Sequence, residues 1–220
     1  MLINPFTILL ACLPLVGYLL LLGMIRVSGR TVVTSGARDL VALGIGISGL
    51  IAIGPIELFF PTAAATVFGP YVWIALAIFY SLCLSLCALT SQPRLVVYGR
   101  SRMQTYEALL KAAQQIDPAA GGTADNLQIV LPSINVRLRV DGAPHSDWAQ
   151  VFAFEPNLNA TFWNRLQARL RSEFADSTVQ RNYQGLLTLA AAACLIAFMV
   201  WHCRGREELV VEGFRKWLWR

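Results

Sequence analysis

The sequence predicts a membrane α-helical protein with four transmembrane helices and a small extramembrane α+β domain. Four long apolar runs predict the helices, because an α-helix of about twenty residues crosses roughly 30 Å of hydrocarbon. A charged stretch of about ninety residues between the third and fourth runs predicts the folded domain. The composition agrees with this fold class, since 56% of the 220 residues are hydrophobic and only 14% are charged.

The apolar runs set the expected boundaries. Residues 1–92 contain three predicted transmembrane helices, at about 6–25, 40–60 and 71–89, and residues 183–203 form the fourth. The first run is longer and more uniformly apolar than the core of a secretory signal, so we expect it to remain in the protein as a helix.

Residues 93–182 form the expected soluble domain, with the element order β-α-β-β-β-α. Short β-prone or alternating runs predict the strands; one of them places Ile134, Val136, Leu138 and Val140 on one face. The four expected strands cover residues 95–98, 127–131, 134–140 and 148–154. Gly122 belongs to a predicted loop.

Two helices complete the predicted domain. Ser101 is a suitable N-cap for the first helix, which Asp117 and Pro118 end. The second helix covers residues 158–175, where an apolar side chain recurs at every fourth position. The domain is therefore expected to be a layer of mainly antiparallel sheet covered by two helices.

The C-terminal tail, residues 204–220, has the pattern of an amphipathic helix that lies at a membrane surface. Val210, Phe214 and Trp217 share one face of that helix, whereas Glu212 and Lys216 stay polar. The alternative is that the tail docks on a partner.

The distribution of arginine predicts the orientation in the membrane. Arg26, Arg30 and Arg38 lie in the link between the first two helices, and residues 61–70 contain no charge. By the positive-inside rule the N-terminus is outside and residues 93–182 are cytoplasmic. The tail conflicts with this arrangement, because it places five further basic residues outside.

The net charge of +5 does not indicate nucleic-acid binding, since the basic residues cluster beside the ends of apolar runs. The five cysteines lie in or at the end of these runs, so no disulfide framework is expected. We expect neither a cofactor nor a metal ion.

Two short motifs resemble those of cofactor-binding or catalytic sites, but each has a simpler structural interpretation. Gly44, Gly46 and Gly49 spell the GxGxxG of dinucleotide-binding proteins, but they lie inside an apolar run. There the small residues Gly44, Ser48 and Gly49 are expected to let another helix approach closely. His145, Ser146 and Asp147 are the residue types of a hydrolytic triad. Adjacent positions in a turn cannot form that geometry, so we interpret them as a polar loop.

Four residues are candidates for function. Glu57 is the only carboxylate within a predicted membrane span, and ionisable groups in such spans are often functional. Arg94, Arg100 and Arg102 follow the third helix at the depth of anionic lipid headgroups.

Three strings, GARDL at residues 36–40, GPIELFFP at 54–61 and FGPYVW at 68–73, resemble a family of bacterial multi-pass membrane proteins of unassigned function. The likeness covers mainly the first hundred residues. It implies a bacterial inner membrane and gives no functional residues to transfer.

We therefore expect a non-enzymatic membrane protein that presents a cytoplasmic α+β domain for protein interaction or for regulation of a membrane complex. The domain contains no convergent set of acid, base or metal-binding residues. One alternative is a small transport or channel component that uses Glu57 and small-residue helix faces. A second is a membrane enzyme that acts on lipid headgroups. The expected partners are the bilayer and either another protein or a second copy of the chain.

Overall fold

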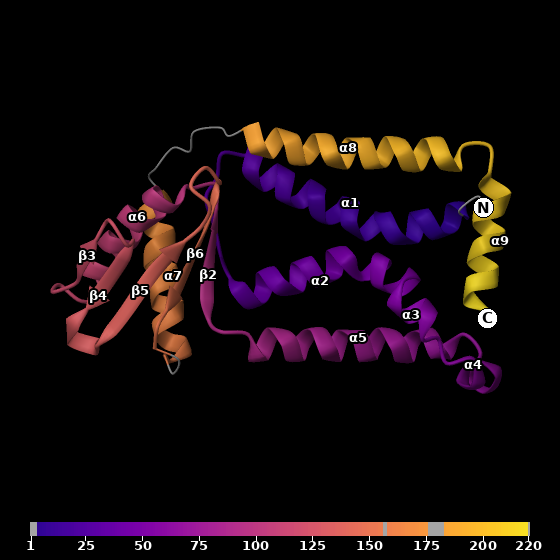
Figure 1. The fold of residues 1–220 in the computed structure, drawn as a ribbon, viewed down its shortest axis with the longest axis horizontal. Helices are drawn as coiled ribbons and strands as arrows, with labels where there is room; N and C mark the ends of the chain where they lie inside the picture. Colours follow the sequence, from indigo (N-terminus) through magenta and orange to yellow (C-terminus); the bar gives the residue numbers. More distant parts are fainter. Residues whose placement is uncertain (1–3, 156–157, 176–182, 220) are drawn as a thin grey trace. The chain divides into compact units, whose positions relative to one another are not determined.

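The computed structural model describes residues 4–155, 158–175 and 183–219, with the backbone alone at positions 57, 62 and 183. The chain divides into two compact units (Figure 1). The helical unit comprises Met1–Leu22, Val41–Leu89 and Leu187–Arg220. The sheet unit comprises Gly23–Leu40 and Thr90–Leu186.

Four helices in the described part of the chain are long and apolar enough to cross a membrane. They are α1 (Pro5–Val27), α2 (Gly36–Ile53), α5 (Tyr71–Thr90) and α8 (Tyr183–Cys203). With 18 to 23 residues each, they are about 27 to 35 Å long at 1.5 Å per residue. The prediction of four apolar helices of spanning length is confirmed.

The second helix ends earlier than the sequence predicts. It was expected over residues 40–60, whereas α2 ends at Ile53 and is followed by the short helices α3 (Pro55–Leu58) and α4 (Thr62–Phe68). The physical reason is Pro55, which lacks the backbone N–H of a continuing helix and disfavours helical geometry in the residue before it. Glu57 therefore lies in α3, outside the candidate span.

Small residues on α2 let its neighbours approach closely. A Cβ atom at Gly49 would collide with the backbone carbonyl oxygen of Leu10 in α1, and one at Gly46 would lie 2.8 Å from the Cβ of Tyr18. On α5, the Tyr80 hydroxyl donates a 2.7 Å hydrogen bond to the carbonyl of Gly44. The helix-packing interpretation of GxGxxG is confirmed, because its glycines are the contact points of α2 with α1 and α5.

The C-terminal helix α9 (Glu207–Leu218) packs on the N-terminal end of α1 and on α5. The Phe6 ring lies 5.7 Å from Phe214, and the Trp73 and Trp217 rings stack 3.7 Å apart. The Trp73 indole also donates a 3.0 Å hydrogen bond to the Trp217 carbonyl. Part of the apolar face of the tail is thus covered by this chain. Its position at a membrane surface or on a partner stays a prediction.

The described residues of the sheet unit form six antiparallel strands in the order β1-β2-β6-β5-β4-β3 (Figure 1). The strands are β1 (Val32–Ser35), β2 (Arg94–Tyr98), β3 (Gly121–Thr123), β4 (Gln128–Leu131), β5 (Val136–Asp141) and β6 (Trp148–Ala153). Helices α6 (Arg102–Gln114) and α7 (Ala160–Ala175) cover one face, since their buried side chains join those of the strands in one core.

The predicted order β-α-β-β-β-α is wrong in two places. Between Arg94 and Ala175 the order is β-α-β-β-β-β-α, because Gly121–Thr123 forms a strand where a loop was expected. In addition, Val32–Ser35 in the link between α1 and α2 supplies the edge strand β1. Gly121–Thr123 is too short and too rich in glycine to give a strand signal of its own, whereas the β-branched residues of Val32–Ser35 were overlooked in a link between two apolar runs. Pairing with β4 and β2 defines the two strands.

The remaining elements follow the predicted patterns closely. Val136, Leu138 and Val140 face the core, whereas Ile134 is in the 3₁₀ turn η1 (Pro132–Ile134) before that strand. Ser101 caps α6 in a capping box with Gln104. The predicted repeat in the last helix buries Leu166, Leu170 and Phe174.

Asp117, which follows the end of α6, is a buried carboxylate that holds the 3₁₀ turn η1 in place through hydrogen bonds. It accepts hydrogen bonds from the backbone N–H of Ala119 at 3.0 Å and of Ser133 at 2.9 Å, and from the Ser133 hydroxyl at 2.8 Å. Burial alone would raise the pKa of Asp117, but these three hydrogen bonds outweigh it and hold the pKa below its ordinary value.

We expect this carboxylate to make the sheet unit sensitive to acid. Because its folded-state pKa is depressed, its contribution to stability is present above the unfolded value of about 3.9 and is lost as the pH falls through the lower folded-state value. Asp117→Asn should therefore lower stability at pH 7 and flatten the loss of stability below about pH 4. Hydrogen exchange of β4 and β5 in the detergent-solubilised chain measures this. Asp125→Asn, in an exposed turn, is the control; equal acid profiles for wild type and Asp117→Asn would contradict the account.

Candidate functional site

The structure does not bring the four sequence-predicted candidates into one site. The side chain of Glu57 lies outside the described residues. Arg94 begins β2 and Arg100 follows its end, so the two mark opposite ends of that strand, and Arg102 begins α6. The Cγ of Arg94 lies against Gly36, where a side chain would not fit.

Arg100 is the only one of these arginines that is almost fully buried, with 7% of its surface exposed. Its Nε donates a 2.9 Å hydrogen bond to the Thr31 hydroxyl, and its guanidinium lies 5.4 Å from the centre of the Phe174 ring. Burial lowers the pKa of Arg100, although an arginine remains charged at neutral pH. Arg100 therefore connects the segment before β1 to the end of α7.

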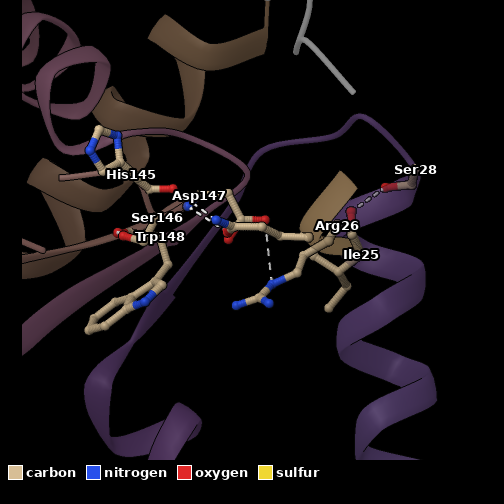
Figure 2. A network of polar contacts seen from close by, with 8 residues as sticks. Ile25, Arg26, Ser28, His145, Ser146, Asp147 and Trp148 are labelled. Atoms are coloured by element: carbon tan, nitrogen blue, oxygen red, sulfur yellow. Dashed lines mark hydrogen bonds and ion pairs between the residues drawn. The ribbon is translucent and has the colours of Figure 1, made fainter. Parts of the chain in front are cut away.

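A second buried polar group defines the strongest candidate site, which we call the Asp147 junction. It consists of Arg26 at the end of α1, Gln184 at the start of α8, and the segment His145–Asp147 between β5 and β6 (Figure 2). All three segments belong to the sheet unit, so the junction holds the last turn of one apolar helix and the first turn of another against the sheet.

Backbone hydrogen bonds fix the position of Asp147. Its carbonyl oxygen accepts from the N–H of Gly99 at 2.7 Å and of Arg100 at 3.1 Å, immediately after β2. Its own N–H donates to the Gln184 side-chain oxygen at 3.2 Å, and the Gln184 amide donates in turn to the His145 carbonyl at 2.8 Å. Gln184 thus connects the start of α8 to two backbone groups of this loop, the N–H of Asp147 and the carbonyl of His145.

The carboxylate of Asp147 is held by charge alone. Only 4% of the side chain is exposed, and neither carboxylate oxygen accepts a hydrogen bond from the described part of the protein. The Arg26 Nε, on a side chain 16% exposed, lies 3.6 Å from one of these oxygens, too far for a hydrogen bond. Since a buried charge is costly without a partner, Asp147 depends on Arg26.

Two glycines make the junction sterically feasible. Gly99 has φ of +87°, a conformation that favours glycine, and it turns the chain toward Asp147. A Cβ at Gly185 would lie 2.8 Å from the Cβ of Arg26, so the lack of a side chain there lets α8 start beside the end of α1.

The polar contacts of the junction are those of an electrostatic link. The Ser146 hydroxyl lies 3.0 and 2.9 Å from the carbonyls of Ala143 and Trp148, and the His145 ring points away from the Asp147 carboxylate (Figure 2). The described residues also contain no group of three His, Cys, Asp or Glu side chains that could hold a metal ion.

Sequence reasoning missed this site, although its residues carried a signal. His145, Ser146 and Asp147 were interpreted as a polar loop, and Arg26 was treated as a topological charge. Asp147 differs from an ordinary loop aspartate because its neighbours Trp148 and Ala149 begin a strand, which carries it into the protein interior. The pairing with Arg26 depends on a contact across about 120 positions that no local pattern reveals.

Comparisons with protein-family models, with curated proteins and with solved structures found no match to this chain. The resemblance of its first hundred residues to an uncharacterised bacterial family therefore stays a prediction.

The Arg26–Asp147 pair can be tested by a double-mutant cycle. Arg26→Met leaves a buried carboxylate without its counter-charge, so we expect the sheet unit to lose about 3 kcal/mol of stability. Adding Asp147→Asn should recover at least about 1 kcal/mol of that loss. Hydrogen exchange of the β2 and β6 amides in the full chain reports the opening free energy.

The exposed pair Arg137 and Glu155 is the matched control. Its side chains are 61% and 27% exposed and lie 3.2 Å apart, so the same cycle with Arg137→Met and Glu155→Gln should give less than about 1 kcal/mol. Additive effects of the two substitutions at the junction would show that its charges do not interact.

Proposed function

We propose that this chain is an integral membrane protein that presents its sheet unit for interaction with another protein or for regulation of a membrane complex, without catalysing a reaction. The apolar surface of the four long helices supports the membrane setting. On α5, Phe79, Leu82 and Leu86 are each more than 60% exposed, and water would make such a continuous apolar face unfavourable. Lipid removes that cost.

The orientation that we propose follows the arginines. Arg26, Arg30 and Arg38 flank β1, whereas the link that holds α3 and α4 has no basic residue. The N-terminus would then be outside and the sheet unit in the cytoplasm, beneath a bacterial inner membrane.

The Asp147 junction is the observation that carries the regulatory part of the proposal. It binds the last turn of α1 and the first turn of α8 to the loop between two central strands. Chain connections add to this link, since β1 leads directly into α2 and only residues 91–93 separate α5 from β2. A partner that changes the sheet would therefore act on the ends of all four long helices.

The sheet offers a surface for such a partner. Helices α6 and α7 cover one face. On the opposite face, β4 and β6 leave apolar side chains partly accessible to solvent, and β5 presents charged ones. Val130 on this face and Phe154 just beyond β6 are both 43% exposed, and Arg139 is also exposed, opposite Phe152 in the neighbouring strand. A mixed aromatic and basic surface of this kind suits protein recognition.

No further observation favours either of the two alternatives, a transport component or an enzyme that acts on lipid headgroups. A transport role depends on Glu57, which α3 places outside the candidate spans. A headgroup enzyme that uses Arg94, Arg100 and Arg102 together is not supported either, because these residues mark different places in the sheet unit. Both stay predictions.

Membrane insertion and orientation are testable together. The chain should stay in the membrane after carbonate washing, because four apolar helices in lipid are not released at high pH. Reporter fusions after Ala64, Gly122 and Arg220 should report outside, inside and outside. An outside signal at Gly122 would contradict the orientation, and release by carbonate would contradict insertion.

The interaction surface is testable by photocrosslinking in cells. A photoreactive residue at Val130, on the uncovered face, should give a discrete adduct whose second component is a membrane-complex protein. The same residue at Arg165, exposed on α7, is the control and should give none. In an Arg26→Met background the Val130 adduct should weaken if the junction sets the state of the sheet. Equal labelling at both positions would contradict the proposed surface.

A further inference from the structure

A cavity of about 490 Å³ lies in the sheet unit beside the start of β1. Residues Gly29–Val33 form one side, and Arg171, Phe174 and Ala175 of α7 form the other. We propose that this cavity binds a phosphate group, either as the free anion or as the ester of a lipid headgroup. The argument rests on the arginines that surround it.

Two arginines line the cavity without a carboxylate partner among the described residues. The guanidinium of Arg30 makes no hydrogen bond or ion pair there, and the residue is exposed. Arg171 uses its Nε and one Nη to donate to the Val33 carbonyl, at 3.2 and 2.8 Å. An arginine has five N–H donors in a planar fork, so Arg171 keeps donors for an anion while the Val33 contact fixes its orientation.

Arg100 lies behind the cavity wall and orients two of its lining residues. Its Nε donates to the Thr31 hydroxyl and its guanidinium lies over the Phe174 ring, and both Thr31 and Phe174 line the cavity. Because the Thr31 oxygen accepts from Arg100, its own O–H can donate to an anion. The described lining residues include Arg30 and Arg171 and no Asp or Glu, a composition that suits a ligand of high negative charge.

The position of the cavity in the chain, close to the end of α1, allows a lipid headgroup to supply the phosphate. Gly29 follows the end of α1 by two residues, which span at most about 7 Å of chain. The polar headgroup layer is about 5 to 8 Å thick on each side of the hydrocarbon. The lipid source rests on the membrane insertion proposed above, whereas binding of free phosphate does not.

The test uses the full chain in two settings. In detergent, calorimetric titration with inorganic phosphate measures binding of the free anion. In nanodiscs, native mass spectrometry compares retention of phosphatidic acid with that of phosphatidylcholine. We expect the wild type to bind at least one of phosphate and phosphatidic acid. Retention of phosphatidic acid without phosphate binding assigns the lipid source, and phosphate binding assigns the free anion.

The variants identify the site. Arg30→Gln with Arg171→Gln should weaken the observed binding at least tenfold, because both charge-assisted contacts to the phosphate are lost. Arg165→Gln with Arg169→Gln removes the same charge from the exposed face of α7 and should leave binding unchanged. If the double variant loses hydrogen-exchange protection, its fold is disturbed and the single variant Arg30→Gln becomes the test of the site. We expect that single variant to weaken binding at least threefold.

Three results would overturn the proposal. They are absence of binding for both probes, wild-type affinity in the Arg30→Gln variants, and an equal loss in the α7 control. The detergent titration does not require insertion, so failure of the phosphate site and failure of the proposed membrane function remain distinguishable.

Discussion

Strand β1 lies between α1 and α2 in the chain, yet it pairs along its whole length with β2, which follows α5. Its edge position would normally leave backbone groups without partners. Here the Val33 carbonyl accepts hydrogen bonds from Gln167 and Arg171 of α7, while the Val33 side chain is buried in the core. The link between two apolar helices is thereby an integral part of the sheet.

The pairing of β1 with β2 restricts movement of the link between α1 and α2. A link that is also a strand cannot move without breaking ladder hydrogen bonds, each of which costs more when broken in a buried setting than in water. The Asp147 junction adds a second connection that depends on charge and burial instead of on a ladder. The first connection is made by strand pairing and the second by a buried ion pair. A change in backbone pairing and a change in side-chain charge should therefore affect them differently.

The sequence was sufficient for features that local patterns encode. Four apolar runs, the Ser101 cap and the repeat from Leu158 to Phe174 each specify an element through neighbours in the chain, and the glycines of α2 were correctly interpreted as packing contacts. Features set by distant contacts were missed. Val32–Ser35 becomes a strand only beside β2, and Asp147 becomes a buried charge only beside Arg26.

The candidate site was therefore less predictable than the fold. Intramembrane position made Glu57 attractive, but Pro55 ends α2 before it. Arg100 was selected for its expected proximity to lipid headgroups, whereas the structure shows a buried side chain that contacts Thr31 and Phe174. Its relation to Arg30 and Arg171 emerges only when α7 packs beside β1.

Cysteine cross-linking of β1 to β2 tests the central claim most directly. Thr34 and Val96 are register partners, and such antiparallel partners lie within the Cα separation that a disulfide requires. In the full chain with its five native cysteines replaced, Thr34→Cys with Val96→Cys should oxidise to a disulfide in membranes. Thr34→Cys with Val97→Cys, whose side chain points to the other face, should not. Equal cross-linking of the two pairs, or none for the first, would contradict the account.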